Sequence, residues 1–262
     1  MFNIFKITPN SIHRIIKKDK NKLIIQAEFY SNNLPGIYGF LAKVIHFWDI
    51  QIANRFAPNL NLGFDSLIAN PNTGEGRVYM LNNATWAGAR DAATGDATNG
   101  AVDIQSNGGA NYTNVRAFFP FDTSSLPDTA IISAANFQYY ANVIVNTDTT
   151  TAVLVVQTQA SNTSLAVEDY DQVAFIAKAT VALSAITTSA YNTFTISDLT
   201  TISTTGHTKF ALITGRDLAN SQPTGDNIMT GDNRGAANPP KLTVTYTVGG
   251  NTSSRMMRGL GT

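Results

Sequence analysis

Apolar and polar residues alternate along most of the chain after residue 60, in short runs separated by Gly, Asn, Asp, Pro and Thr. Alternation with a period of two places successive side chains on opposite faces of a β-strand. Short runs of this kind, divided by turn-forming residues, are typical of a β-sandwich or barrel. The pattern predicts ten strands, at residues 62–68, 76–81, 101–105, 114–121, 131–145, 151–158, 173–181, 191–196, 209–214 and 241–248.

Three of these runs indicate which residues face the core. In the last run Leu242 and Val244 alternate with threonines, which predicts one apolar face and one face rich in threonine. In the run 131–145 the same alternation puts Phe137, Tyr139, Ala141 and Val143 on the apolar face. It leaves Tyr140 as the large ring on the polar face. The run 152–156 is apolar at every position, so we expect a central strand that is covered on both faces.

A strong helical period occurs once, before residue 60. Apolar residues recur there at i, i+3, i+4, i+7, i+8, i+11 and i+15, the spacing of one face of an α-helix. The residues of this face are Ile37, Phe40, Leu41, Val44, Ile45, Trp48 and Ile52. The helix could dock on the protein's own sheet, or it could serve in assembly or anchoring against a subunit or a membrane surface. Ser11 could cap a shorter helical turn that carries Ile15 and Ile16.

Composition supports an all-β fold and limits the chemistry. The 262 residues suffice for one large domain with an extension. Charged residues make up 14% of the chain, and 18 basic side chains balance 18 acidic ones. These values exclude a highly charged disordered chain and a globally cationic nucleic-acid binder. Because the chain has no cysteine, disulfides, thiol nucleophiles and cysteine metal sites are excluded.

The balanced total hides an uneven distribution of charge. Residues 1–60, here called the head, hold eight basic and three acidic side chains, a net charge of +5. Residues 61–262 hold ten basic and fifteen acidic side chains, a net charge of −5. We expect a basic, amphipathic-helical head, a jelly-roll β-sandwich over residues 61–250 (the body), and a flexible basic tail over residues 251–262.

The head lacks the pattern of an export signal or of a membrane span. A signal peptide has about 7–15 uninterrupted apolar residues, and a membrane helix has about 20. The apolar stretches that follow the basic run 17–22 are interrupted by Gln26, Glu28, Lys43 and His46. We therefore expect no transmembrane segment and no conventional signal peptide. The basic run could contact nucleic acid, but a run of this size is usually a solvated arm.

Three segments of the body resemble one known domain family. Residues 116–127 read Arg-Ala-Phe-Phe-Pro-Phe-Asp-Thr-Ser-Ser-Leu-Pro, residues 131–135 read Ile-Ile-Ser-Ala-Ala, and residues 238–246 read Asn-Pro-Pro-Lys-Leu-Thr-Val-Thr-Tyr. Together they resemble the disaggregatase-related (DNRLRE-type) domains found on bacterial surface and phage-borne proteins. The resemblance spans about residues 75–248. It implies a jelly-roll β-sandwich similar to non-catalytic carbohydrate-binding modules, and it implies no particular reaction.

The residues of the first segment also have a structural interpretation of their own. Asp122 stands at a strand end, where its carboxylate can accept backbone N–H bonds and cap the turn that Pro127 ends. Arg116 falls on the strand face opposite to Ala117 and Phe119. We expect Arg116 to form a structural ion pair with a carboxylate of the body.

The inventory for catalysis is small, and we expect no enzyme activity. His207 is the body's single histidine, nothing resembling a nucleophile elbow occurs, and the three histidines lack the spacing of a zinc site. A glycosidase would need two facing carboxylates, for which Glu75 and Glu168 are candidates.

Two acidic turns raise the question of a structural calcium ion, the one cofactor that the chain suggests. The residues Thr-Gly-Asp-Asn at 224–227 recur at 230–233. Asp217, Asp226 and Asp232 could supply oxygens for calcium. A pair of Asx turns is the simpler interpretation, because the spacing does not match a known calcium loop.

Two functional hypotheses from different classes remain. The first is a non-enzymatic structural or interaction protein of a virion, filament or cell surface, which self-associates or contacts other structural subunits through the head and displays the sandwich outward. The alternative is a secreted carbohydrate-binding module that binds polysaccharide. Exposed aromatic rings would stack on the sugars, and the candidates are Trp86, Tyr79, Tyr112 and Tyr140.

Overall fold

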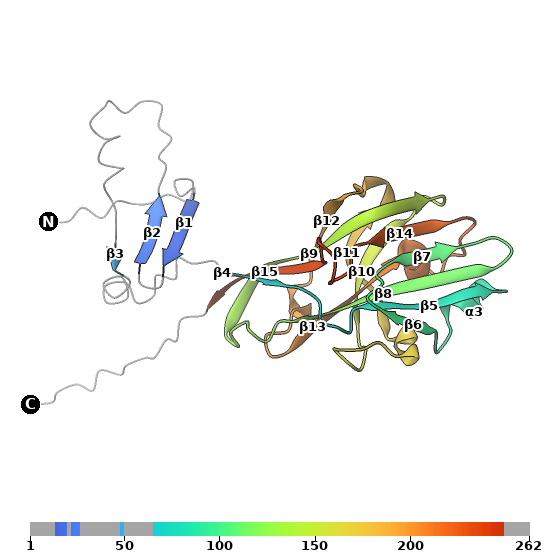
Figure 1. Cartoon of the computed structure of the whole chain (residues 1–262), viewed down its shortest axis with the longest axis horizontal. Coiled ribbons are helices and arrows are strands. Elements are labelled where there is room, and N and C mark those ends of the chain that lie inside the picture. Colours follow the sequence, from blue (N-terminus) through green and yellow to red (C-terminus); the bar gives the residue numbers. More distant parts are fainter. Residues whose placement is uncertain (1–13, 20–21, 27–47, 50–64, 249–262) are drawn as a thin grey trace, which may run out of the picture. The chain divides into compact units, whose positions relative to one another are not determined.

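The computed structural model describes residues 14–19, 22–26, 48–49 and 65–248. The chain divides into two units, Met1–Leu62 and Gly63–Thr262 (Figure 1). The expected tail, residues 251–262, lies outside the described residues.

The described part of the first unit is an antiparallel sheet with the strand order β1-β2-β3. Its strands are β1 (Arg14–Asp19), β2 (Lys22–Gln26) and β3 (Trp48–Asp49). Ile15 and Ile16 lie in β1, so the short helical turn expected there is wrong, in keeping with the strand preference of β-branched residues. Trp48, expected on the long helix, lies in β3. The other residues of that helical face lie outside the described residues: Ile37, Phe40, Leu41, Val44, Ile45 and Ile52.

The second unit is all-β, with twelve strands in one antiparallel sheet. The strands are β4 (Asp65–Ala69), β5 (Gly76–Asn83), β6 (Asp96–Asn99), β7 (Ile104–Asn107), β8 (Tyr112–Asp122), β9 (Ala130–Asn146), β10 (Thr151–Gln157), β11 (Val173–Ala182), β12 (Ala190–Thr195), β13 (His207–Thr214), β14 (Asn227–Gly231) and β15 (Lys241–Val248). The helical elements are α3 (Trp86–Arg90), η1 (Val167–Asp171), η2 (Leu183–Ala185), η3 (Leu199–Thr201) and α4 (Gly215–Leu218).

All ten strands expected from the alternation are present, with ends that differ by a few residues. Two further strands, β6 and β14, were missed. Strand β14 lies between the two Thr-Gly-Asp-Asn turns, and its short run of Asn, Ile, Met and Thr carries little periodic signal. Of the part of the chain that the structure describes, no helix has the length and hydropathy needed to cross a membrane.

The strand order is β11-β10-β13-β8-β7-β14-β9-β15-β4, with β12 paired to β9 and β5 paired to β6 and β8. The sheet folds over on itself, because β8 and β9 are separated in this order and yet pack their rings together. The centroids of Phe119 in β8 and Phe137 in β9 are 5.0 Å apart. The main core lies between these layers and includes Leu154, Leu242 and Val244. The expected inward positions of β15 are thus confirmed.

A second apolar cluster covers the opposite face of the layer that contains β10. Val153 and Val155 point into this cluster, together with Tyr170 of η1, while Leu154 points into the main core. Because β10 pairs with β11 on one edge and β13 on the other, it is a central strand covered on both faces, as expected.

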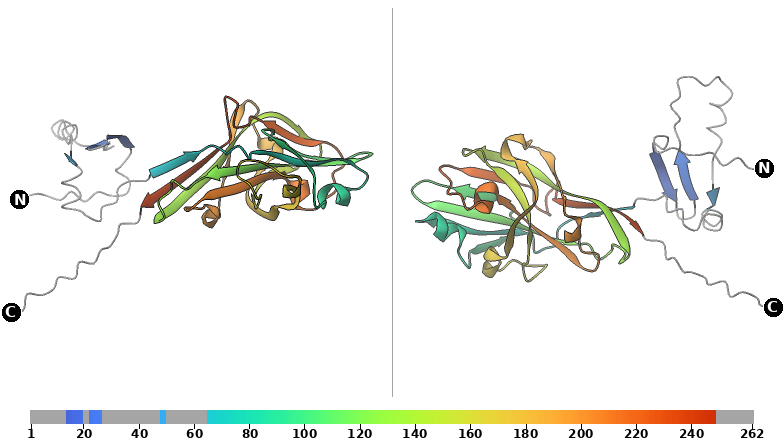
Figure 2. Two further views of the ribbon diagram at one scale, coloured as in Figure 1. Left: turned by 60° about the horizontal axis from the view of Figure 1, so that its bottom comes forward. Right: turned by 180° about the vertical axis from the view of Figure 1, so that it is seen from behind.

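The first and last strands of the unit pair with each other. Strands β4 and β15 lie side by side (Figures 1 and 2). In their register Leu242 lies opposite Ala69 and Tyr246 lies opposite Asp65. Strand β15 pairs on its other edge with β9, a strand of 17 residues that also pairs with β12 and β14. These pairings bring β4, β15, β9 and β12 into one continuous layer.

Candidate functional site

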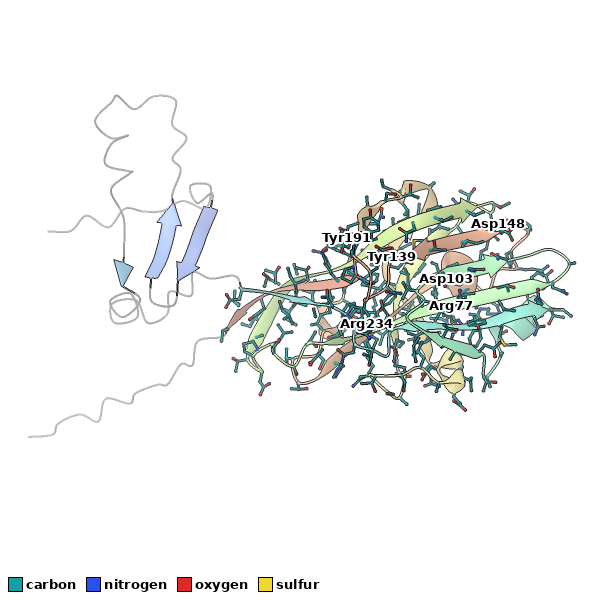
Figure 3. All side chains as sticks on the ribbon, viewed as in Figure 1. Arg77, Asp103, Tyr139, Asp148, Tyr191 and Arg234 are labelled. Carbon is teal, nitrogen blue, oxygen red and sulfur yellow. The ribbon has the colours of Figure 1, made fainter. Side chains whose placement is uncertain are left out.

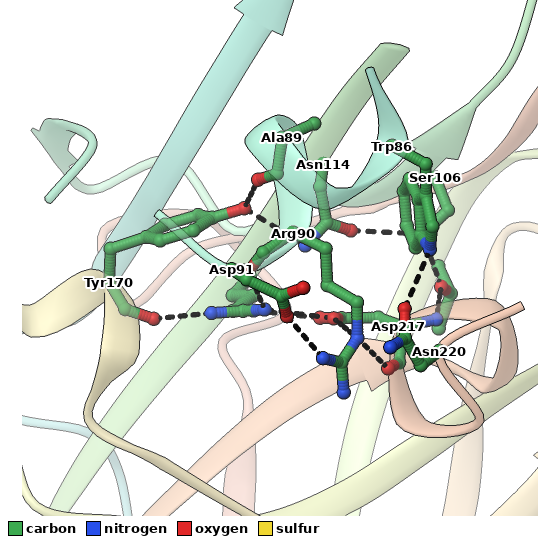
Figure 4. Close-up of polar contacts among 11 residues, drawn as sticks. Trp86, Ala89, Arg90, Asp91, Ser106, Asn114, Tyr170, Asp217 and Asn220 are labelled. Carbon is green, nitrogen blue, oxygen red and sulfur yellow. Dashed lines mark hydrogen bonds and ion pairs between the residues drawn. The ribbon is translucent and has the colours of Figure 1, made fainter. Parts of the chain in front are cut away.

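The expected ion pair of Arg116 is present, and its partner is Asp217. Both side chains are buried. Figure 4 draws the polar contacts around Asp217. The Nε and Nη2 atoms of Arg116 donate to the two carboxylate oxygens of Asp217 at 2.7 and 2.8 Å, a bidentate geometry. Its Nη1 donates to the carbonyl oxygen of Tyr170 at 2.6 Å. Burial alone would lower the pKa of Arg116, but the charge and hydrogen bonds of Asp217 raise it above its ordinary value.

Neighbouring groups complete this polar centre. Arg90 donates from Nε to the Asp217 carbonyl oxygen at 2.7 Å, and the Arg90 carbonyl oxygen accepts from Arg116 Nη2 at 2.8 Å. The hydroxyl of Tyr170 donates to the carbonyl oxygen of Ala89 and accepts from Asn114 Nδ2. Burial raises the pKa of Tyr170 to about 12. Donors and acceptors are matched in this centre, which is the pattern of a structural support.

The three aspartates considered as calcium ligands do not form one group. Asp217 is engaged by Arg116, Asp226 is exposed, and Asp232 accepts from Asn142 Nδ2 at 2.8 Å and from Asn238 Nδ2 at 3.1 Å. Strand β14 separates Asp226 from Asp232, and five extended residues span about 17 Å. Among the described residues, no three His, Asp or Glu side chains gather into a group that could hold a metal ion.

Three of the four rings considered for glycan stacking are engaged within the protein. Trp86 is buried and donates from Nε1 to Asn220 Oδ1 at 3.1 Å, so its indole is not exposed for stacking on a sugar. The ring of Tyr112 packs edge-on against Trp86, with centroids 6.4 Å apart. The ring of Tyr79 is half-buried, and the guanidinium of Arg77 lies 4.9 Å from its centroid. Trp86 is buried as the first residue of the short helix α3. Strand alternation in the sequence could not predict this helix or the burial of Trp86.

The two glutamates considered for hydrolysis differ in environment. Glu168 is exposed on η1. Glu75 is buried, and its Oε2 accepts the backbone N–H of Arg234 at 2.7 Å, while its Oε1 has no hydrogen-bond partner among the described residues. Burial raises the pKa of Glu75 to about 7, against the opposing effect of Arg234.

Arg77, Asp103 and Tyr139 belong to a second polar centre (Figure 3). It lies near Glu75, whose charge acts on Tyr139. Arg77 Nη1 donates to the carboxylate of Asp103 at 2.6 Å, and the Tyr139 hydroxyl donates to the carbonyl oxygen of Val102. Burial, followed by the charges of Asp103, Glu75 and Asp232, raises the pKa of Tyr139 well above its ordinary value. A neutral tyrosine that donates to a main-chain oxygen fixes the core and offers no nucleophile or base.

The remaining candidate, Tyr140, lies on the outward side of β4, β15, β9 and β12, which we call the neutral face. Three rows of opposed residues define this face: Ile68, Thr243, Asn136 and Thr195 in the first, Lys241, Gln138 and Thr193 in the second, and Tyr140 and Tyr191 in the third. Each of these side chains is half-buried or exposed, and Ile68 is 62% exposed. These side chains share one side of the layer because every strand alternates between core and outward positions.

Charge is nearly absent from this layer. Asp65 and Lys241 are the charged residues of the four strands. Asp65 alternates with Ser66 and Ile68 and so falls on the side of Leu67, which packs against the main core. The ammonium of Lys241 lies 4.3 Å from the ring centroid of Tyr191, a cation–π contact.

The two tyrosines of the face pack on each other. The ring centroids of Tyr140 and Tyr191 are 5.4 Å apart, with an interplanar angle of 80°. The Tyr191 hydroxyl donates to the carbonyl oxygen of Pro239 at 3.0 Å. The edge-to-face arrangement holds both rings in place. Sequence reasoning missed Tyr191 as a site residue, although its alternation with the core residues Asn192 and Phe194 marks it as outward-facing. The pairing of β9 with β12 was the missing information.

Comparison of the sequence with models of known protein families gives no match, and comparison with curated protein sequences gives none either.

Proposed function

We propose that the chain is a non-enzymatic structural or interaction protein of a virion, filament or cell surface. In this proposal the body is a jelly-roll β-sandwich displayed outward, and the head serves in assembly or anchoring. The observation that carries the proposal is the neutral face. A solvated sheet face usually carries charged side chains, which discourage association, whereas a broad uncharged face favours contact with another surface.

The distribution of charge supports a separate role for the head. Its net charge of +5 contrasts with −5 for residues 61–262. Basic arms joined to β-rich bodies can bind acidic surfaces of neighbouring subunits, since opposite charges attract over about 10 Å at moderate salt. The head and the neutral face would then act as two different contact surfaces.

The experiment is to measure the mass of the full chain by light scattering at several concentrations. The comparison is a double variant, Phe40→Glu with Val44→Glu, which places charges on the apolar face of the predicted helix. The control is His46→Glu, on the opposite face of that helix. We expect the parent and the control to form the same assemblies and the double variant to lose the larger ones. A parent chain that stays monomeric at every concentration contradicts the proposal.

Carbohydrate binding is the second candidate, and Tyr140 with Tyr191 is the observation that favours it. Both rings lie on the neutral face, which also carries the amides of Gln138 in the next row and Asn136 in the row beyond. These amides can hydrogen-bond to sugar hydroxyls. Retention in gels that contain neutral plant, fungal or bacterial polysaccharides tests this function. We expect Tyr140→Ala to abolish retention and Tyr79→Ala to preserve it. Equal mobility of the parent in all gels contradicts this candidate.

A further inference from the structure

The neutral face extends across four paired strands without interruption. The row of Ile68, Thr243, Asn136 and Thr195 crosses from β4 to β12, and each pair in it is a registered antiparallel pair. Ile131 of β9 lies opposite Thr247 and is also 62% exposed. Methyl and hydroxyl groups of threonine, two isoleucines and two amides therefore make up most of the outward surface of this layer.

Charge decides which partner this surface fits. A nucleic acid or an anionic membrane would require several free cations, but the single cation of the face, Lys241, lies over the ring of Tyr191. A strongly charged protein would leave its own ions without partners on an uncharged surface, at a cost in desolvation. The surface therefore fits another uncharged surface.

A second copy of the chain supplies such a surface. Residues 61–262 hold 25 charged side chains, ten basic and fifteen acidic, and two of them lie in the four strands. If two bodies made contact through another surface, surfaces of like net charge would come together and repel each other. Contact between two neutral faces avoids this repulsion. A two-fold axis needs a self-complementary patch, and a sheet face whose one charged side chain, Lys241, packs on the ring of Tyr191 satisfies this requirement.

We infer that two copies of the chain pair through the neutral face, sheet against sheet. The layers would stack about 10 Å apart, the ordinary spacing of packed sheets. This inference rests on the proposed structural function and specifies which surface of the body makes the contact.

Charge introduced into the face tests the pairing in the full chain. Ile68→Lys brings like charges together across a two-fold contact, and we expect the dimer dissociation constant to rise at least about tenfold in sedimentation equilibrium. The control is Ile176→Lys, on β11 at the other end of the strand order, where the parent side chain is 65% exposed. We expect this control to dimerise like the parent.

Cross-linking gives an independent positive signal, because the chain has no native cysteine. Thr243→Cys lies within the neutral face, and Thr180→Cys lies on β11. With a short bismaleimide reagent, we expect the first variant to form a covalent dimer and the second to remain a monomer. Equal cross-linking of both variants overturns the inference, as does its absence from both.

Failure of the inference can be distinguished from failure of the proposed function. If Phe40→Glu with Val44→Glu dissociates the assembly and Ile68→Lys does not, the head makes the contact and pairing through the face is wrong. If the parent chain is monomeric at every concentration, both proposals are wrong.

Discussion

At the scale of single residues, two buried carboxylates differ in how well their charge is balanced. Asp217 is bound by Arg116 through two hydrogen bonds and lies 3.5 Å from Arg90. Glu75 has one backbone donor on Oε2, and the pKa of about 7 shows that burial outweighs the attraction of Arg234. We therefore expect the bidentate ion pair of Asp217 to support the fold, and the ionised form of Glu75 to destabilise it.

Removal of Asp217 is the first prediction at this scale. Asp217→Ala leaves the buried guanidinium of Arg116 without its partner, and we expect a loss of about 3–5 kcal/mol in the free energy of unfolding. Urea denaturation followed by circular dichroism measures this loss. Asp226→Ala is the control, because Asp226 is exposed, and it should change stability by less than about 0.5 kcal/mol. Equal effects of the two substitutions would contradict the structural role of Asp217.

The second prediction concerns pH. The pKa of Glu75 is about 7 in the folded state and near its ordinary value of 4.5 in the unfolded state. Between these values the folded chain keeps a proton that the unfolded chain has lost, so the free energy of unfolding falls as pH rises through this window and levels off above it. The full shift corresponds to a few kcal/mol, of order 3.

Glu75→Gln tests this pH dependence because glutamine cannot ionise. We expect the fall between pH 4.5 and 7 to be smaller in this variant and its stability at pH 8 to exceed that of the parent, as measured by urea titrations at each pH. Glu168→Gln, at an exposed glutamate, should retain the parent profile. A Glu75→Gln profile that follows the parent would show that Glu75 titrates normally.

At the scale of elements, strand periodicity accounts for most of the sheet. Alternation is visible in the sequence wherever one face of a strand is buried, which is why the buried face of β15 and most of that of β9 were predicted. Val143, expected on the buried face of β9, is 51% exposed, because the register of β9 with β14 shifts between its partners Ala141 and Val143. Strand β14 was not predicted, since its run of Asn, Ile, Met and Thr has little periodic signal and is flanked by turn residues. The Asp122 cap was predicted from sequence and is present, with its Oδ1 accepting the backbone N–H of Ser124 at 3.0 Å. Such contacts are local, and local residues are enough to predict them.

The contact of β14 with β9 gives the third prediction. The register shifts between Thr230 and Gly231, which lies opposite Ala141. A Cβ on Gly231 would lie 2.3 Å from the Tyr140 carbonyl oxygen and 2.4 Å from the Tyr139 ring. We expect Gly231→Ala to cost about 1–3 kcal/mol of stability in thermal or urea unfolding.

Gly109→Ala is the matched control for Gly231→Ala. A Cβ at Gly109 meets nothing within 4 Å. This substitution should leave stability unchanged or raise it by less than about 1 kcal/mol, because alanine restricts the unfolded chain. If both substitutions were tolerated equally, the close approach of β14 to β9 would be refuted.

At the scale of the whole molecule, the candidate site depends on information that sequence patterns do not contain. The alternation showed that Tyr140 and the threonines of β15 face outward. It did not show that β15 and β12 flank the same strand, because strand order depends on contacts between distant segments. For the same reason Arg116 was expected to find a carboxylate, but Asp217, 101 residues away, could not be identified.

The fourth prediction concerns the effect of salt on self-association. Contacts between the basic head and acidic surfaces should weaken as salt screens charge, whereas pairing through the neutral face should persist. In sedimentation velocity from low salt to about 1 M sodium chloride, we expect larger assemblies to give way to dimers. Complete dissociation to monomers at high salt would show that charge alone holds the copies together.

The pairing of β4 with β15 has a consequence for how such a unit can be used in evolution and in engineering. Its first and last strands lie side by side, with Asp65 opposite Tyr246. A unit whose chain enters and leaves at neighbouring points can be inserted into a surface loop of another protein without forcing the two sides of that loop apart. Strand β15 pairs with both β4 and β9, and it is the last of these strands to be synthesised. The layer therefore forms only after β15 has left the ribosome, when synthesis of the unit is nearly complete.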